Sequence, residues 1–179
     1  MNPEEIETIR QQAVKDYNKR KFDAALDGFN TCLAFYENAG DELLAAEMRN
    51  NISVTLLGRK EAREAYDIVK GTDEIFASHG DRRRQAMAMA NTAAALEALG
   101  QKEEALALYE QTLDIFKEIG EKSMRANILR RISDLQIKTK RGYQAIASME
   151  AALDQGEKHS VKDSVFKTTL RAIRNKFLK

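Results

Sequence analysis

The chain has 179 residues, of which 43% are apolar and 32% are charged, and this composition excludes a disordered chain. Its formal net charge is +1, which gives no overall attraction to nucleic acid or to an anionic membrane. A single cysteine excludes an intrachain disulfide, and no apolar run reaches the roughly 18 residues of a membrane-spanning helix. The N-terminus lacks the apolar core of a signal peptide, so we expect a cytoplasmic protein without a membrane span.

Residues of one kind recur at a fixed interval along the chain. Gly40, Gly80 and Gly120 lie 40 residues apart. Two series of small residues have the same spacing: Ala13, Ser53, Ala93 and Ser133 form the first, and Ala25, Ala65, Ala105 and Ala145 form the second. A fixed period of this length is typical of repeat arrays, whose units each bury an apolar face against the next. The sequence therefore predicts one domain, 1–179, with repeats 1–40, 41–80, 81–120 and 121–160.

Each repeat predicts two amphipathic helices joined by a short turn. In the first repeat, Pro3 suits the start of a helix, residues 18–21 form the turn, and Gly40 ends the second helix as a left-handed cap. In the second repeat, Gly58 marks the turn. Gly71 falls within the predicted second helix, where it costs about 1 kcal/mol relative to alanine. We therefore expect the second repeat to be the least stable.

The third repeat is the most regular, and the fourth follows the same pattern. One apolar stripe of the third repeat runs from Ala86 to Leu99 and the other from Ala105 to Phe116. Residues 161–179 predict a single helix with a polar outer face, which a terminal unit needs for contact with water. No run of β-branched residues is bounded by turn residues, so the chain is predicted to be all-α.

The two series of small residues resemble the motif of tetratricopeptide repeats, whose second helix carries A-x-x-x-F. The corresponding pairs are Ala25/Phe29, Ala65/Val69, Ala105/Tyr109 and Ala145/Met149. The period is 40 residues instead of about 34, and glycine replaces the terminal proline, so the repeats are similar to the long ones of kinesin light chain. The resemblance implies a right-handed solenoid of four helical hairpins, closed by the capping helix 161–179. It also implies that the first helices line a concave groove.

Positions two residues before each small residue of a first helix point away from the partner helix, because they lie about 200° around the helix axis. Under the resemblance, these positions face the groove. Asparagine amides both donate and accept hydrogen bonds, which suits an extended peptide backbone, and arginines suit carboxylates. The candidate groove residues are Arg10, Gln11, Asn50, Asn51, Met87, Asn91, Asn127, Arg130 and Arg131. The sequence leaves open that Asn51 and Asn91 bond neighbouring helices and that Arg131 is solvated.

The groove residues are graded in chemistry along the chain. Glu7 and Glu47 lie at the rim of the first half, Met87 gives an apolar middle, and the fourth repeat is basic. A peptide segment with an apolar centre and an acidic end fits this gradient. The sequence therefore predicts a non-enzymatic adaptor that binds a segment of another protein.

Two alternative functions remain at this point. The turns within the repeats are basic, through Lys19, Arg20, Lys21, Arg59, Lys60, Lys102, Lys138, Lys140 and Arg141. Stacked along one edge, they would attract the phosphates of nucleic acid or an anionic surface, although charged turns are also common because they stay hydrated. Since no aromatic residues except Tyr143 interleave with these cations, we do not expect nucleic acid as the partner. The other alternative is a homo-oligomer that associates through apolar residues of the last helix, namely Val165, Phe166 and Leu170.

Residues that could carry catalysis or bind a metal are few. The chain has two histidines, His79 and His159, which fall at the same turn position two repeats apart and so cannot share an ion. Cys32 aligns with small packing residues and is predicted to be a buried apolar residue. There is no nucleophile–base pair and no glycine-rich phosphate loop. We expect no catalytic site, no metal, no cofactor and no small-molecule substrate.

Overall fold

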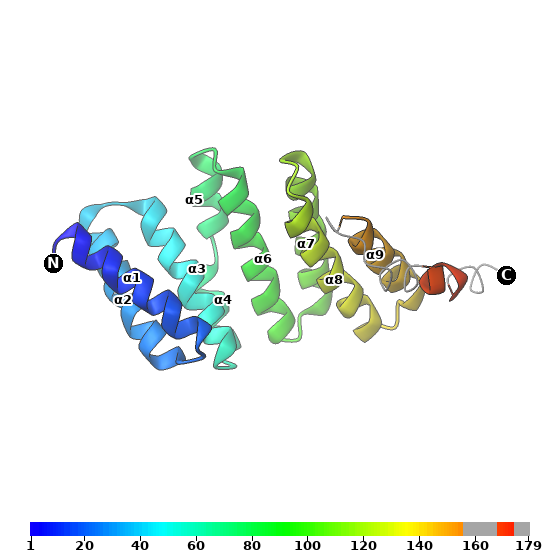
Figure 1. Ribbon diagram of the computed structural model, residues 1–179, viewed down its shortest axis with the longest axis horizontal. Coiled ribbons are helices and arrows are strands. Elements are labelled where there is room, and N and C mark those ends of the chain that lie inside the picture. The colour runs from blue at the N-terminus through cyan, green and yellow to red at the C-terminus, as the bar shows by residue number, and fades with distance from the viewer. Residues whose placement is uncertain (156–167, 174–179) are drawn as a thin grey trace. The chain divides into compact units, whose positions relative to one another are not determined.

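The computed structural model describes residues 1–155 and 168–173, and these ranges contain helices and no strands. The helices are α1 (Pro3–Asn18), α2 (Phe22–Ala39), α3 (Glu42–Gly58), α4 (Ala62–Val69), α5 (Thr72–Ser78), α6 (Arg82–Ala98), α7 (Lys102–Glu118), α8 (Lys122–Lys138) and α9 (Gly142–Asp154) (Figure 1). The predicted all-α helical-hairpin fold class is confirmed. Residues 168–173 are helical, and the rest of the predicted capping helix lies outside the described residues.

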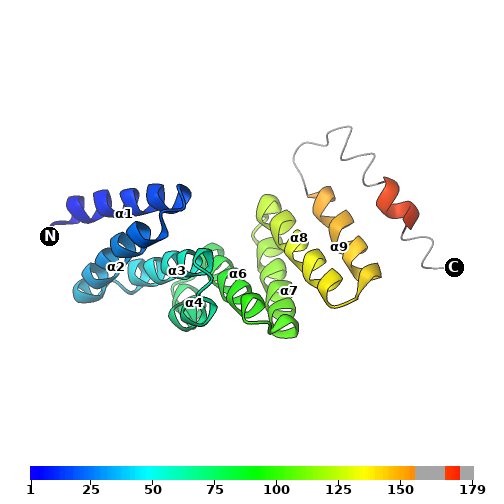
Figure 2. The same cartoon turned by 90° about the horizontal axis from the view of Figure 1, so that it is seen from below.

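The chain falls into two compact units, Met1–Gln101 with α1 to α6 and Lys102–Lys179 with α7 to α9. In unit 1, α1 pairs with α2, and α2 packs on α3 (Figure 2). The helix α3 also contacts α4, α5 and α6. In unit 2, α8 packs between α7 and α9. Within unit 1, the turns α1–α2 and α3–α4 lie at one edge, and the connections α2–α3 and α5–α6 lie at the opposite edge (Figure 1). That both units belong to one domain stays a prediction.

The helix ends share one backbone motif, the Schellman motif, in which an N–H donates to a carbonyl five residues earlier. The donors are Lys21, Asp41, Glu61, Asp81, Gln101, Glu121 and Arg141, with N···O distances of 2.8–2.9 Å. The residue before each donor has a left-handed backbone, and these residues are Arg20, Gly40, Lys60, Gly80, Gly100, Gly120 and Lys140. The left-handed cap predicted at Gly40 is confirmed, with φ 72°. The half-repeat of 20 residues is therefore visible in the backbone.

The small residues of the two series form the closest contacts between paired helices. None of the eight is more than 2% exposed. Ser53 Oγ donates to the Ala65 carbonyl at 2.8 Å, and Ser133 Oγ donates to the Ala145 carbonyl at 2.8 Å. The two serines therefore form a hydrogen bond at the helix contact where the other repeats have a packed alanine. The residues that repeat every 40 positions thus lie at the same contact in each repeat.

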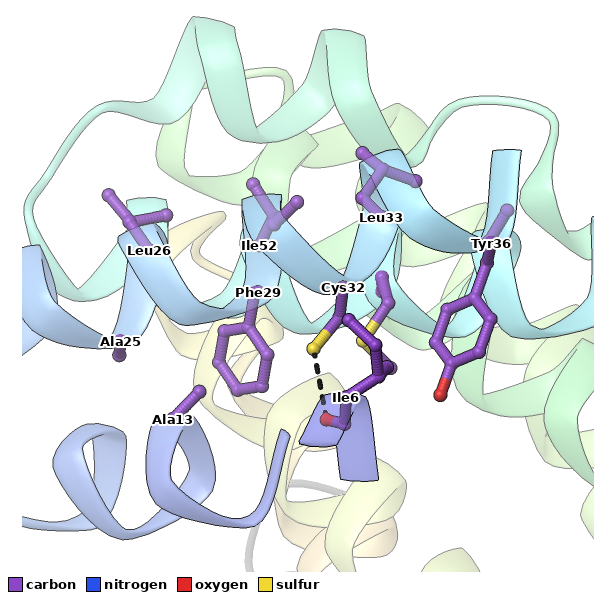
Figure 3. Packing of buried hydrophobic residues seen from close by; sticks show 11 residues of the cluster. Ile6, Ala13, Ala25, Leu26, Phe29, Cys32, Leu33, Tyr36 and Ile52 are labelled. Carbon is purple, nitrogen blue, oxygen red and sulfur yellow. Dashed lines mark hydrogen bonds between the residues drawn. The ribbon is translucent and has the colours of Figure 1, made fainter. Parts of the chain in front are cut away.

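The core of the first repeat shows how tightly these helices approach (Figure 3). A Cβ atom added at Gly28 would lie 2.8 Å from Ala13 Cβ, and one added at Gly58 would lie 2.6 Å from the ring of Phe22. Gly58, expected to mark a turn, is instead the last residue of α3, and the left-handed turn residue is Lys60. Glycine at 58 thus allows a close approach of helices.

Cys32 is fully buried in this core, as predicted. Its thiol lies 3.6 Å from the Ile6 carbonyl and donates to it (Figure 3). Burial raises the pKa of the thiol, so Cys32 is protonated at neutral pH and acts as a small apolar residue.

The prediction of one continuous second helix in the second repeat is wrong. The helix is interrupted between α4 and α5, because Lys70 is extended and Gly71 is left-handed with φ 81°. A left-handed residue cannot continue the helical hydrogen-bond pattern. Thr72 Oγ1 donates to the Val69 carbonyl at 2.8 Å and so replaces one of the lost bonds. Gly71 therefore breaks the helix instead of only weakening it.

Candidate functional site

Side chains of α3, α5 and α6 line a pocket of about 260 Å³ in unit 1. The lining residues are Glu47, Asn50, Asn51, Phe76, Arg83, Arg84, Met87 and Asn91. Four of them, Asn50, Asn51, Met87 and Asn91, were predicted from the sequence to face one groove. The structure thus brings these four together, although their contact with a ligand stays a prediction.

Asn91, Asn50 and Thr72 form a series of side-chain hydrogen bonds that we call the amide relay. Asn91 Nδ2 donates to Asn50 Oδ1 at 2.9 Å. Asn50 Nδ2 donates to Thr72 Oγ1 at 2.9 Å and to the Ala46 carbonyl at 2.9 Å. Asn50 is only 9% exposed, so its amide is satisfied internally. The relay connects the pocket to the break between α4 and α5.

Asn51 differs from its neighbour Asn50. It is half-buried and lines the pocket, and its side-chain amide makes no hydrogen bond within the described residues. Met87 lies on α6 at the same pocket, with its sulfur 3.7 Å from Arg83 Nη1. The pocket therefore offers one free amide beside an apolar, flexible side chain.

A second network, which we call the ion-pair chain, runs across α1, α3 and α6. Glu47 Oε1 lies 3.2 Å from Arg10 Nη1, and Glu47 Oε2 lies 3.3 Å from Arg84 Nη1. Arg10 also pairs with Glu7 at 2.8 Å, and Arg84 pairs with Asp81 at 2.6 Å. The rim carboxylates, Glu7 and Glu47, are therefore paired with arginines within unit 1.

The pairing changes the protonation of the carboxylates. Hydrogen bonds from Arg10 and Gln11 lower the pKa of Glu7 from 4.5 to about 2. The backbone N–H and the guanidinium of Arg84 lower the pKa of Asp81. Both carboxylates therefore remain charged at physiological pH, and the ion-pair chain persists there.

Sequence reasoning missed Arg84 and Phe76 as parts of this pocket. The guanidinium of Arg84 lies over the Phe76 ring at 5.3 Å, which is a cation–π contact. The available signal was the spacing of Arg10, Glu47 and Arg84, which are 37 residues apart and not 40. This spacing is shorter by about one helical turn, so it links neighbouring first helices diagonally.

The other predicted groove residues lie outside the pocket lining. Gln11 is exposed and donates to Glu7 Oε1 at 2.8 Å. Asn127, Arg130 and Arg131 are exposed on α8 in unit 2, where Arg130 Nη1 donates to Asn127 Oδ1 at 3.1 Å. Their participation in a groove with an apolar middle and a basic end stays a prediction.

Comparison with known protein families matches residues 2–176 to the family described as soluble NSF attachment protein, SNAP. The chain belongs to this family. SNAP proteins are α-helical adaptors that bind other proteins, and the family is not one of enzymes. The predictions of a helical-repeat fold and of a protein-binding adaptor are confirmed at this level. The specific likeness to kinesin light chain repeats and the peptide groove stay predictions.

A comparison with curated proteins returns no match. Of the helices in residues 1–155 and 168–173, none combines the length and the apolar content needed to cross a bilayer.

Proposed function

We propose that this SNAP-family chain is a non-enzymatic adaptor that binds an extended segment of a partner protein at the pocket of unit 1. The observation that carries the proposal is the Asn51 amide, which lines the pocket without a hydrogen-bond partner in the described residues. An amide can accept from a peptide N–H and donate to a peptide carbonyl at once. Asn51 therefore suits a partner backbone that runs past α3.

The size and lining of the pocket support a protein partner over a small substrate. Its volume of about 260 Å³ is below the roughly 300–1,000 Å³ of small-molecule sites. Met87 supplies a flexible thioether, which adapts to apolar side chains of different shape. The pocket thus suits one apolar side chain of a longer segment, held beside a backbone contact at Asn51.

The surrounding networks support binding by fixing the pocket before the ligand arrives. The amide relay holds Asn50 and Asn91, and the ion-pair chain holds Arg84 against Glu47. A surface that is already ordered loses little conformational entropy on binding. We therefore assign Asn50 and Asn91 as positioning residues and Asn51 and Met87 as contact residues.

The finer features of the partner are also part of the proposal. The family is described by attachment to NSF and by SNARE binding, so proteins of these two classes are the first partners to test. Arg10 and Gln11 in unit 1, and Asn127, Arg130 and Arg131 in unit 2, would contact further parts of the segment, including an acidic end. A cytoplasmic location agrees with the single buried thiol of Cys32. Self-association stays an alternative, since Val165 and Phe166 lie outside the described residues.

The test is site-specific photo-crosslinking from position 87, followed by mass spectrometry of the crosslinked partner segment and titration of that segment as a peptide. Asn51→Ala is expected to weaken binding of the peptide about tenfold, because the two hydrogen bonds between the neutral Asn51 amide and the peptide backbone are lost. Asn38→Ala makes the same chemical change at an exposed position of α2 and should leave affinity unchanged. Equal affinity of wild type and Asn51→Ala would reject the pocket as the peptide site.

A further inference from the structure

The turn edge of unit 1 carries cations that have no acidic partner. Within the described residues, Lys19, Arg20, Lys21 and Lys60 form no ion pair, and all four are exposed. The fifth cation of these turns, Arg59, pairs with Asp23 and Glu61. We call these five cations the basic edge of unit 1. The arginines of the ion-pair chain, in contrast, are neutralised by carboxylates.

Two residues of the basic edge hold an unfavourable backbone conformation. Arg20 has φ 58° and Lys60 has φ 68°, in the left-handed region that disfavours residues with a Cβ atom. The same Schellman motif uses Gly40 and Gly80 at the opposite edge of unit 1. Since glycine satisfies the motif there, the backbone alone does not explain arginine and lysine at positions 20 and 60. Such local strain is typical of functional sites.

Three cations of the basic edge line an open hollow of about 610 Å³. Its lining residues are Arg20, Lys21, Phe22, Asp23, Ala24, Arg59 and Glu61. Asp23 Oδ1 lies 2.7 Å from Arg59 Nη1, and Glu61 Oε1 lies 2.8 Å from Arg59 Nη2, so the Arg59 guanidinium is fixed in the wall. Arg20 also lines an adjacent hollow of about 380 Å³ with Tyr17 and Phe22. Arg20 and Lys21, the two lining cations without an acidic partner in the described residues, thus lie in the same hollow as the fixed Arg59 guanidinium.

We propose that this hollow binds a soluble ligand that carries two or more phosphate groups close together. Three cations and two carboxylates line the hollow, and the neighbouring residues Lys19 and Lys60 raise the excess on these turns to three positive charges. Each phosphate group brings a charge of about −1.5 to −2 and accepts hydrogen bonds from several directions. Arginine has five N–H donors and lysine has three, and neither has an acceptor, so they match such a group.

Two other ligand classes fit the hollow less well. Carboxylates on an extended acidic peptide carry one charge each and, on one face, are separated by roughly 7 Å, so few reach the same hollow. A membrane surface binds basic segments best when apolar side chains insert beside them. Residues 18–21 and 59–60 are all polar, and Phe22 packs against Gly58 below them.

The test is calorimetric titration of the full chain with inorganic tripolyphosphate. The double variant Arg20→Gln/Lys21→Gln is expected to weaken binding at least tenfold. Lys70→Gln, which removes one positive charge at an exposed site outside the hollow, should leave binding unchanged. Arg20→Gly is the decisive variant. It should weaken binding and yet keep or raise the melting temperature, by about 1–3 °C, because the left-handed strain is relieved.

Several outcomes would overturn the proposal. It is wrong if wild type does not bind tripolyphosphate, if the double variant binds it equally well, or if Arg20→Gly retains full affinity. An oligoglutamate peptide that binds as tightly would assign the edge to an acidic protein segment. Binding to vesicles with multiply phosphorylated inositol lipid, without binding to tripolyphosphate, would assign it to a membrane. Asn51→Ala should leave tripolyphosphate binding unchanged, so the peptide pocket is tested separately.

Discussion

The second helices of the first two repeats begin alike and end differently. Ala25 in α2 and Ala65 in α4 are both fully buried at the contact with the paired first helix. The helix α2 continues unbroken for 18 residues, whereas the second repeat is interrupted at Lys70 and Gly71 and resumes as α5. The small-residue contact therefore sets where a second helix starts but not how far it runs.

The break changes what the first helix of the same repeat can do. Position 10 in the first repeat corresponds to position 50 in the second, and position 32 corresponds to position 72. Arg10 pairs with the partly exposed carboxylates of Glu7 and Glu47. Asn50, in contrast, is buried against Thr72. The Thr72 hydroxyl at the start of α5 accepts from the Asn50 amide, so an asparagine is held inside the second repeat. This difference between the repeats leads to four expected outcomes.

The largest expected effect on stability comes from the buried side chains of α2 and α4. Phe29→Ala should lower the free energy of unfolding by about 3–5 kcal/mol, because the ring is 2% exposed and leaves a cavity. Val69→Ala, at the corresponding position of the broken helix, removes fewer carbon atoms and should cost about 2 kcal/mol. Urea unfolding followed by circular dichroism measures both. Equal losses would mean that the two repeats are packed alike despite the break.

The next effect concerns the amide relay. Thr72→Val keeps the shape of the side chain but removes the hydroxyl that bonds Asn50 and the Val69 carbonyl. Leaving these buried groups without a partner should cost about 1–3 kcal/mol. Thr31→Val in the unbroken α2 removes an exposed hydroxyl bond and should change stability by less than about 0.5 kcal/mol. A near-neutral Thr72→Val would show that the relay does not stabilise the break.

A smaller effect is expected at the break itself. Gly71→Ala should destabilise the protein by about 1–2 kcal/mol, because alanine disfavours the left-handed backbone at φ 81°. Gly142→Ala is the control, since that glycine begins α9 and an added Cβ meets no atom within 4 Å. It should stabilise by about 0.5–1 kcal/mol. Stabilisation by Gly71→Ala would indicate that the second helix can run straight.

The smallest effect is a protonation change in the first repeat. The carboxyl of Glu7 should titrate near pH 2 in wild type and move up toward 4.5 in Arg10→Gln, as measured by NMR. Because the pKa is lower in the folded state, the pair stabilises the fold above pH 4.5, and this contribution disappears as pH falls toward 2. An unchanged midpoint in Arg10→Gln would show that Arg10 does not hold the Glu7 carboxylate.

Part of the candidate site could be predicted from the sequence. The 40-residue spacing placed Asn51 and Asn91 on one surface, since residues at one helical angle share a face in stacked hairpins. Met87 precedes Asn91 by four residues and so lies on the same face of the helix. The spacing did not predict that the Asn50 side chain would be buried, because its burial depends on a hydrogen bond to the Thr72 hydroxyl on another helix. The diagonal pairing of Arg10, Glu47 and Arg84 also depends on how far neighbouring helices are offset.

The sequence by itself determined the all-α repeat, the helix pairs and their buried small residues, because these follow from local periodicity and from close packing that tolerates no larger side chain. Only the tertiary structure decided the interruption at Gly71, the burial of Asn50 and the unpaired cations at positions 20 and 60. Glycine and lysine are each compatible with a helix and with a turn. The choice between these conformations is made by contacts between residues that are distant in sequence.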